Sequence, residues 1–556
     1  MRVSALALLA LLALAGSATA QVRHTETPAQ ATEPDPNALI RPTDLTTPPT
    51  AHHLTANQAL AIARRVPKIA DLLRRHPGAH GEAYEKGLVQ WQVSIFAPGK
   101  ERKEIGQVKI DDATGAVVEA WTGFQVAWTM ARGYPGAFGR IVNSPWIWVP
   151  LSVLFVLAFV DPRRPFRWLH LDLLALSAFS VSLAFFNHAD IGWSVPLVYP
   201  PLVYLLIRML VVALRRGGDA PPVRPLVPIA WLAVACVFLI GFRIGLNATN
   251  SNVIDVGYSG VIGADKLAHG KPLYGDFPKD DQYGDTYGPV AYEVYVPFER
   301  LEPWHGVWDD LPAAHIAAVF FDLLCVLLLF LIGRQIRGPD LGVMLAYAWC
   351  SYPFTLYVSN SNTNDSLLAA LVLLAVLLAG RPAGRGAATA LAGLTKFAPL
   401  ALAPVLATHA APRGRLAGTM ARFAVGFLVA GAIACIPLFL HENLSDFWKH
   451  SVQFQADRGS PFSIWGFRGW TTAQHVVQGL AVLLAIVIAF VPRRRDVAGL
   501  AAACAAVLLA LELGVTHWFY LYVPWFFGLV MLALLGRSSP GAGRPPGSSP
   551  RSPTPA

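Results

Sequence analysis

Residues 386–408, GAATALAGLTKFAPLALAPVLAT, form an apolar stretch with one charged side chain, Lys396, near its middle. About 20 apolar residues suffice to cross a bilayer, so the stretch could form one transmembrane span. Pro399 lies three residues after the lysine, and proline disfavours a continuous helix. The stretch is therefore either one crossing or a hairpin that enters and returns on the same side. The choice fixes the orientation of every segment after it.

The composition of the whole chain indicates a membrane protein. Of the 556 residues, 54% are hydrophobic and only 14% are charged, whereas soluble domains average about 25% charged residues. The net charge of +9 comes from short arginine clusters between apolar runs. That distribution is typical of membrane topology and not of a nucleic-acid-binding face. We therefore expect a polytopic α-helical protein of the cell membrane, with the lipid bilayer as a partner and no nucleic acid.

Apolar runs of span-like length recur along the chain, and we expect about 11 spans beside the 386–408 stretch. Lysine and arginine favour the cytoplasmic ends of spans. A single crossing at 386–408 would place Arg413, Arg415 and Arg422 outside, whereas a hairpin places every arginine cluster inside. The charge pattern therefore predicts a hairpin that bends near 394–399. The 11 runs are 145–160, 168–187, 194–214, 225–246, 313–333, 340–358, 365–380, 417–438, 471–491, 497–513 and 518–536.

Lys396 would lie at the tip of this hairpin. An ionisable side chain within a membrane segment is a functional candidate by default. The alternative is a lysine whose ammonium group reaches the interface and serves no site.

The N-terminus has the pattern of an export signal. Arg2 precedes an apolar run, and small residues at Ala18-Thr19-Ala20 suggest cleavage after residue 20; the alternative is an uncleaved anchor. In either case the segment after residue 20 should lie outside the cytoplasm. Residues 21–54 are rich in Pro and Thr and are expected to be a disordered leader.

Residues 55–125 are predicted to form a small exported α+β domain. Thr55 to Gln58 match a capping box, and Pro67 is placed to start a second helix. Alternation over 89–95 predicts a half-buried strand, with further strands at 105–110 and 117–121 joined by a turn at 112–115. The stretch GQVKIDDATGAVVEAWTG resembles the end of a PepSY-type domain. The resemblance implies binding or regulation and transfers no catalytic residue; a structural appendage is the alternative.

Two long loops would face outside, at 247–312 and 439–470. Both mix carboxylates with tyrosine and tryptophan. Carboxylates can accept hydrogen bonds from sugar hydroxyls, and aromatic rings can cover the C–H faces of a sugar. The alternative for any single ring is the aromatic belt found in most membrane proteins.

The order of several motifs resembles a known family. An Asp comes after an early span in NSNVIDVGYSG, residues 250–260. ADKLAHGKPLYGDF, YGPVAYEVYVPFE, NSNTNDSLLAALVLLA, GAATALAGLTKFAPLALAP and SVQFQADRGSPFSIWG then occur in this order. Together they resemble glycosyltransferase family 87, within the C-type membrane glycosyltransferases (GT-C), over residues 225–536. The spans within 144–224 fall outside the best match.

The resemblance implies transfer of a sugar, typically mannose, from a polyprenyl phosphate to the hydroxyl of a glycan or lipid acceptor on the external face, with inversion. It also implies an acidic residue at the active site in the first external loop, and Asp255 matches. A carboxylate near the attacking hydroxyl can accept its proton. The apolar neighbours of Asp255 predict desolvation that would raise its basicity. The alternative is that Asp255 is the N-cap of a loop helix.

The remaining candidates are chosen by the same chemistry. A lipid-phosphate leaving group needs positive charge, for which Lys396 and Arg458 are candidates; a solvated Arg458 is the alternative. We expect neither a metal nor another cofactor, and we interpret Asp280 and Asp281 as solvated acids. For the sugar or acceptor the candidates are Tyr258, Tyr274, Tyr287, Asn364, Asp365 and His517. Helix capping is the alternative for Asn364 and Asp365, and a place in the aromatic belt is the alternative for His517.

Two other functions remain open from the sequence. A transporter or flippase of lipid-linked sugars would use ionisable groups at mid-membrane, such as Asp322 and Glu512. A membrane sensor would read a ligand through the PepSY-like domain, but the expected cytoplasmic tail, 537–556, is rich in Pro, Gly and Ser and is expected to be disordered. Neither the sugar nor the acceptor can be read from the residues.

Overall fold

The structure is a computed structural model that describes residues 39–99, 102–215, 223, 225–412, 414–441, 444–457, 459–491 and 494–536. The expected signal peptide, 1–20, and tail, 537–556, lie outside the described residues. The chain divides into two compact units. One comprises the residues up to Val126 together with Pro297–Asp309, and the other comprises Ala127–Val296 and the residues from Asp310 onward.

The N-terminal unit contains two helices and an antiparallel five-stranded meander in the order β1-β2-β3-β4-β5. Its helices are α2 (Ala56–Arg65) and α3 (Pro67–Arg75), and its strands are β1 (Leu39–Ile40), β2 (His80–Lys86), β3 (Gln90–Phe96), β4 (Glu104–Asp111) and β5 (Val117–Thr122). The capping box at Thr55 and Gln58 is present, and Pro67 begins α3, as predicted. Trp91, Val93 and Ile95 of β3 are buried in the core beside Ile69 and Leu72 of α3.

Two expectations for this unit are wrong. β3 is buried on both faces, because Gln92 and Ser94 are also buried, so the strand is not half-exposed. Part of the expected disordered leader is ordered: Leu39 and Ile40 pair with β2, and the backbone N–H groups of His53 and Leu54 donate to the Asp112 carboxylate. Backbone pairing and a buried acceptor, neither visible in composition, order this segment.

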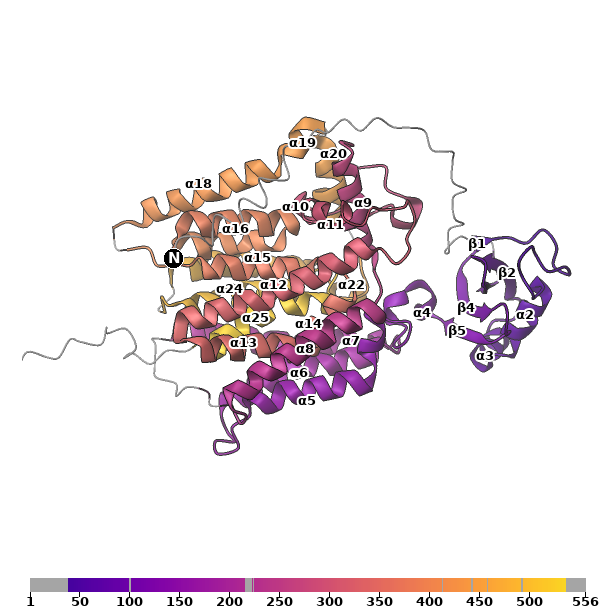
Figure 1. Cartoon of the computed structure of the whole chain (residues 1–556), viewed down its shortest axis with the longest axis horizontal. Helices are drawn as coiled ribbons and strands as arrows, with labels where there is room; N and C mark the ends of the chain where they lie inside the picture. The colour runs from indigo at the N-terminus through magenta and orange to yellow at the C-terminus, as the bar shows by residue number, and fades with distance from the viewer. Residues whose placement is uncertain are drawn as a thin grey trace, which may run out of the picture. The chain divides into compact units, whose positions relative to one another are not determined.

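The second unit is almost entirely helical, and its long helices lie side by side (Figure 1). The shorter helices α9, α10 and α20 gather at one end of this bundle (Figure 1). The helices before the centre of the unit are α5 (Pro145–Phe159), α6 (Trp168–Phe186), α7 (Ile191–Leu214), α8 (Ile229–Thr249), α9 (Asp255–Ala268), α10 (Val290–Glu293), α12 (Pro312–Arg337), α13 (Pro339–Ser351) and α14 (Pro353–Asn360). The later helices are α15 (Asp365–Leu377), α16 (Pro382–Thr395), η5 (Ala398–Leu402), α17 (Ala403–Thr408), α18 (Leu416–Ala434), α19 (Ile436–His441), α20 (Leu444–Phe447), η6 (Trp448–Gln453), α21 (Phe454–Asp457), α22 (Ile464–Arg468), α23 (Thr471–Phe490), α24 (Val497–Gly514), η7 (Tyr520–Tyr522) and α25 (Val523–Leu535). Five short elements complete the assignment: α4 (Phe124–Ala127), η2 (Thr129–Ala131), η3 (Arg140–Asn143), η4 (Lys279–Asp281) and α11 (Val296–Glu299).

The unit has the character of a polytopic membrane protein, but with fewer full-length spans than the sequence predicted. Within the described residues, seven helices are long and apolar enough to cross a membrane, or up to eight if α13 and α14 count as one span. α13 and α14 bend by 60° where Pro353 starts the second helix. α5, α15 and α25 fall short because each helix ends or breaks before reaching span length. The number 11 therefore counted apolar runs and not spanning helices.

The predicted hairpin at 386–408 is present. α16 ends at Thr395, and the chain returns through η5 and α17. The Nη1 atom of Arg385, near the start of α16, donates to the carbonyl of His409, just past the end of α17, over 3.1 Å. The two ends of the stretch are therefore adjacent, and Lys396 lies at the turn between its arms. Gly386 fits against α18 so closely that an added Cβ would lie 2.0 Å from the Phe423 carbonyl oxygen.

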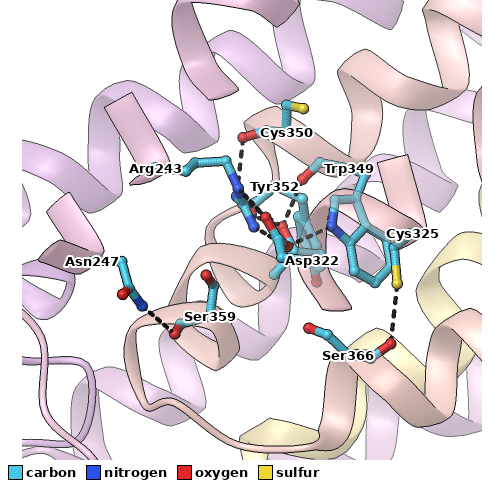
Figure 2. Close-up of polar contacts among 10 residues, drawn as sticks. Arg243, Asn247, Asp322, Cys325, Trp349, Cys350, Tyr352, Ser359 and Ser366 are labelled. Atoms are coloured by element: carbon cyan, nitrogen blue, oxygen red, sulfur yellow. Dashed lines mark hydrogen bonds and ion pairs between the residues drawn. The ribbon is translucent and has the colours of Figure 1, made fainter. Parts of the chain in front are cut away.

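A buried ion pair joins α8 to α12 (Figure 2). Arg243 donates from Nε to Asp322 Oδ2 over 2.8 Å and from Nη2 to Oδ1 over 2.5 Å. Its Nη1 also donates to the carbonyl of Cys350, at the end of α13, and to Thr355 Oγ1 in α14. Trp349 donates its indole N–H to Asp322 (Figure 2). Four helices thus meet at one guanidinium–carboxylate pair from which water is largely excluded.

We predict that Arg243→Met destabilises the protein by roughly 3–5 kcal/mol, because Asp322 is left charged and buried without its partner. Thermal unfolding in detergent measures the effect. Arg243→Met/Asp322→Leu, which removes both charges, should recover most of the loss. Equal melting temperatures for wild type and Arg243→Met would contradict this account.

Candidate active site

A cavity of about 310 Å³ lies in the second unit. Its walls come from segments far apart in the sequence: the start of α9, the 286–287 loop, the start of α15, the hairpin turn at 396–398, and the 515–525 region after α24. Asp255, Lys396, Asp365 and His517 all line it, with aromatic rings between them. Small-molecule sites are typically concave, apolar and set with a few polar groups, and this cavity has that character.

Asp255 is the first residue of α9, and its side chain is exposed while Ile254 and Val256 are buried. The N-cap position belongs to Ile254, so Asp255 is not the N-cap of this helix. The predicted desolvation by apolar neighbours is also wrong, because those side chains turn into the core and the carboxylate does not. Asp255 therefore presents its carboxylate at the cavity wall.

Two Asn-Ser-Asn segments, residues 250–252 and 360–362, hold Asp255 in place. Backbone N–H groups of Asn252 and Ile254 donate to the carbonyls of Asn360 and Ser361. The side chain of Asn362 donates to the carbonyl of Asn252 over 2.9 Å. Gly257, one residue past Val256, lies so close to Asn362 that an added Cβ would be 2.1 Å from its carbonyl oxygen. These contacts fix the start of α9 against the segment that leads to Asp365.

Lys396 is held by one carboxylate and three rings. Its Nζ donates to Asp365 Oδ1 over 2.5 Å. The ammonium group lies 5.4 Å from the ring centroids of Tyr287 and Trp525 and 6.0 Å from that of Tyr522. Cation–π attraction and the charge-assisted hydrogen bond both stabilise an ammonium group at this position. Lys396 thus contributes a fixed positive charge on the cavity wall.

Asp365 is fully buried, and its oxygens are already engaged. Oδ1 accepts from Lys396 and from the Trp525 indole, and Oδ2 accepts from Thr363 Oγ1 over 2.8 Å. Asp365 therefore orients Lys396, and this differs from the direct sugar contact that the sequence suggested.

The 286–287 loop is placed against the hairpin by a glycine. A Cβ on Gly288 would lie 2.1 Å from the carbonyl oxygen of Leu394, so a side chain at this position would push the two segments apart. The phenol of Tyr274 donates to the carbonyl of Tyr287 over 2.8 Å. Tyr287 reaches the cavity through this packing.

The second long loop contacts the first beside the cavity. The His450 ring nitrogen Nδ1 lies 2.8 Å from Asp285 Oδ2, and Gln455 donates to the carbonyl of Thr286 over 3.3 Å. The rings of Tyr283 and Phe454 stack with centroids 5.3 Å apart. Gln455 and Thr286 both line the cavity, so these contacts close one of its sides.

Asp281 is buried, contrary to the expectation of a solvated acid. Burial raises its pKa to about 8, with smaller contributions from the carboxylates of Asp255, Asp280 and Asp285, while a hydrogen bond from Ser259 opposes this shift. Ser259 Oγ lies within 2.8 Å of both Asp281 Oδ2 and the Asp255 carbonyl. Ser259 can donate to Asp281 when that carboxyl is ionised; when Asp281 is protonated, its own proton can go to Ser259 Oγ, and the Ser259 hydroxyl can then donate to the Asp255 carbonyl.

Several predicted site residues do not reach the cavity. Tyr258 and Tyr274 are buried in the core and do not line it, and neither does Asn364. Tyr258 lies one turn after Asp255 on α9, on the face that packs inward. Arg458 lies outside the described residues.

Sequence reasoning missed part of the wall. Trp525, Tyr522, Gln478 and Thr516 line the cavity, as do Met130 and Phe138 from the segment before α5. The aromatic run from Trp518 to Trp525 was a usable signal, although such a run also fits a membrane belt. Among the described residues, no group of three or more His, Cys, Asp or Glu side chains is arranged to hold a metal ion.

We predict that Asp281→Asn stabilises the protein increasingly as the pH rises from about 5 to about 8. The folded state keeps the Asp281 proton up to about pH 8, whereas the unfolded chain loses it near its ordinary pKa of 3.8. Folding therefore takes up a proton in this window, and the wild type loses stability as the pH rises. Thermal unfolding across this range measures the difference, with Asp280→Asn, an exposed neighbour, as control. A difference that does not change with pH would refute the assignment.

Comparison with known proteins points to one family over part of the chain. Residues 286–514 match the family model described as glycosyltransferase family 87. No curated protein matches the chain. Among solved structures, the chain is similar to ArnT from Cupriavidus metallidurans bound to undecaprenyl phosphate, with 16% identity and a TM-score of 0.34. That match covers 56% of this chain and spans 61% of the length of the other. Over residues 286–514, therefore, the chain is similar to glycosyltransferase family 87.

Proposed function

We propose that this protein is a membrane glycosyltransferase of the GT-C type. It transfers a hexose, with mannose favoured, from a polyprenyl phosphate to a hydroxyl of a glycan or lipid acceptor outside the cell membrane. The family match over residues 286–514 supports glycosyl transfer. The observation that carries the mechanism is the cavity in which Asp255 and Lys396 both line the wall.

Asp255 acts as the general base. An acceptor hydroxyl is a poor nucleophile while it keeps its proton, and a positioned carboxylate can take that proton as the oxygen attacks the anomeric carbon. The acceptor oxygen attacks the anomeric carbon from the face opposite the lipid phosphate. The new glycosidic bond forms in the same step in which the bond between the anomeric carbon and the phosphate oxygen breaks. One displacement inverts the anomeric configuration, and no covalent sugar–enzyme intermediate forms.

Lys396 stabilises the lipid phosphate as it leaves. Negative charge grows on the phosphate oxygens as the C–O bond breaks, and a preorganised cation at that position lowers the barrier. Asp365 and the three rings hold the ammonium group before substrate arrives, so little reorganisation is required. Tyr287 and Tyr522 offer ring surface to the sugar or to the first isoprene units.

The proposed reaction uses no metal and no other cofactor, and the donor enters as a substrate. A monophosphate leaving group carries less charge than a pyrophosphate, and a single fixed ammonium group can meet it. Arg458 remains a second candidate for this phosphate, from the sequence alone.

We predict that Asp255→Asn lowers the transfer rate by about 100- to 10,000-fold, because the amide cannot accept the hydroxyl proton. The assay follows labelled sugar from purified polyprenyl-phosphate donors to a panel of glycan and lipid acceptors. Asp255 is exposed, so the variant should keep the wild-type melting temperature. Asp265→Asn, on the same helix but away from the cavity, is the matched control and should transfer normally. Wild-type rates in Asp255→Asn would move the base elsewhere.

We predict that Lys396→Met lowers kcat/KM for the donor about 10- to 100-fold, because a hydrogen-bonded charge on the phosphate is lost. Acceptor KM should change little. Since the single variant also leaves Asp365 unpaired, Lys396→Met/Asp365→Asn separates the two effects: it should recover thermal stability but not donor affinity. A double variant with wild-type donor kinetics would remove Lys396 from the phosphate site.

A further inference from the structure

The segment 128–143 precedes α5 and lies outside the region of family similarity, yet it contributes to the cavity wall. Two of its side chains, Met130 and Phe138, line the cavity together with Asp255. Both side chains are half-buried. The proposed mechanism gives neither of them a role.

Phe138 is held in place by its own segment and by a neighbouring ring. Gly139, the next residue, has a φ of 73°, and an added Cβ would lie 3.2 Å from a ring carbon of Tyr357. Glycine adopts this backbone conformation without strain. Asn143 Nδ2 donates to the carbonyl of Phe138 over 2.6 Å. The buried ring of Phe519 meets the Phe138 ring at 79°, with centroids 5.9 Å apart. The Phe138 ring is therefore positioned before any ligand binds.

Hydrogen bonding joins Phe138 to the segment that carries Asp255. The backbone N–H of Gly139 donates to Asn252 Oδ1 over 2.7 Å. Asn252 precedes Asp255 by three residues. The ammonium group of Lys396, in contrast, contacts the three rings described above. Phe138 is thus linked to the part of the wall that carries the proposed base, which is the part that the acceptor hydroxyl must approach.

We propose that Phe138 is a specificity-determining residue of the acceptor site. Its ring covers the C–H face of the sugar whose hydroxyl is deprotonated by Asp255, so the acceptor is a sugar residue of a glycan or of a glycolipid headgroup. This inference rests on the proposed glycosyl transfer with Asp255 as the base. The face of an aromatic ring carries partial negative charge and attracts polarised C–H bonds.

The rest of the cavity wall favours a sugar over a lipid chain. A pyranose presents C–H bonds on its face and hydroxyl groups around its edge, so it needs an aromatic surface beside hydrogen-bonding side chains. A lipid chain would cover polar side chains without giving them hydrogen bonds, which is costly. Four uncharged polar residues line the same cavity as Phe138: Thr286, Gln455, Gln478 and Thr516.

The first test measures binding without transfer. Methyl glycosides of mannose, glucose and galactose are titrated onto the full chain in detergent, and saturation-transfer NMR records which sugar protons contact the protein. Wild type should bind at least one glycoside, with the strongest signals from the C–H bonds of one face. Phe138→Tyr keeps an aromatic face and should keep this pattern. Phe138→Leu should weaken binding about 2- to 10-fold, because an aromatic contact adds about that much beyond the burial of apolar area.

The matched control for this test is Phe166→Leu. Phe166 is 99% exposed on the loop between α5 and α6 and does not line the cavity, so this variant should bind like wild type. Melting temperatures check the folding of each variant, and Phe138→Met is a second aliphatic variant if Phe138→Leu is unstable. Binding of no glycoside by wild type, or equal binding by wild type and the aliphatic variants, would overturn the proposal.

The second test is kinetic. The acceptors are a soluble oligosaccharide, a glycolipid with the same terminal sugar, and diacylglycerol as a lipid hydroxyl without a sugar. Phe138→Leu should lower kcat/KM for a sugar acceptor about 2- to 10-fold. It should leave kcat/KM for the donor unchanged at saturating acceptor, whereas a distorted site would lower both. Transfer to the glycolipid alone would assign the acceptor to a headgroup. Transfer to diacylglycerol alone would contradict the role of Phe138.

The two tests separate this inference from the proposed function. If wild type transferred no sugar from any polyprenyl-phosphate donor, the proposed function would fail, while the binding test would still decide whether Phe138 covers a sugar. If wild type transferred sugar and the Phe138 variants matched it with every acceptor, the proposed function would stand and the role of Phe138 would be refuted.

Discussion

The ion pair between Arg243 and Asp322 is the interaction on which the arrangement of the site depends. A bidentate guanidinium–carboxylate contact has a fixed geometry, and in a buried setting neither charge can leave its partner without a large cost. It fixes α8 against α12 and draws in the bend between α13 and α14 through the Cys350 carbonyl and Thr355. One helical turn further along α8, Asn247 donates to Ser359 and Asn362 (Figure 2 shows the bond to Ser359). The position of Asp255, which packs against Asn362 through Gly257, depends on this chain of contacts.

Charge balance in the cavity is the second constraint. Among the described residues, the acidic and basic side chains that line the cavity are those of Asp255, Asp365, Lys396 and His517. Asp365 Oδ1 lies 2.5 Å from Lys396 Nζ. The side chain of Asp255 is exposed. Asp281, buried nearby, would add a further negative charge, and its raised pKa keeps it neutral below about pH 8. Under the proposed function, the cavity thus presents the exposed carboxylate of Asp255 to the acceptor.

The sequence predicted those features that depend on local residue patterns or on the side of the membrane to which the arginine clusters are assigned. The hairpin was inferred from the requirement that every arginine cluster lie on one side, and it places Lys396 where α16 ends. Asp255 and Lys396 were both predicted site residues, and both line the cavity. Tyr258 and Tyr274 are buried and do not line the cavity, because the inward face of α9 and of its following loop is set by tertiary packing, which one sequence does not show. The count of 11 spans is not confirmed, because an apolar run does not reveal where a helix breaks, as α13 and α14 do at Tyr352–Pro353.

Arg243 could not have been assigned from sequence alone, because one arginine in an apolar run is equally typical of the end of a span. Its partner, Asp322, is one of the groups that the alternative of a transporter would use, since a transporter needs ionisable groups that change partners during a cycle. The structure gives three such carboxylates fixed cations on other segments: Asp172 pairs with Arg208, Asp322 with Arg243, and Asp365 with Lys396. Glu512, the other group named for a transporter, instead accepts the Trp518 indole N–H over 3.0 Å. Of these three pairs, the last alone borders the cavity. Asp172 and Asp322 are thus accounted for by helix packing, whereas Asp255 and Lys396 line the cavity, where we propose that they act on the substrate.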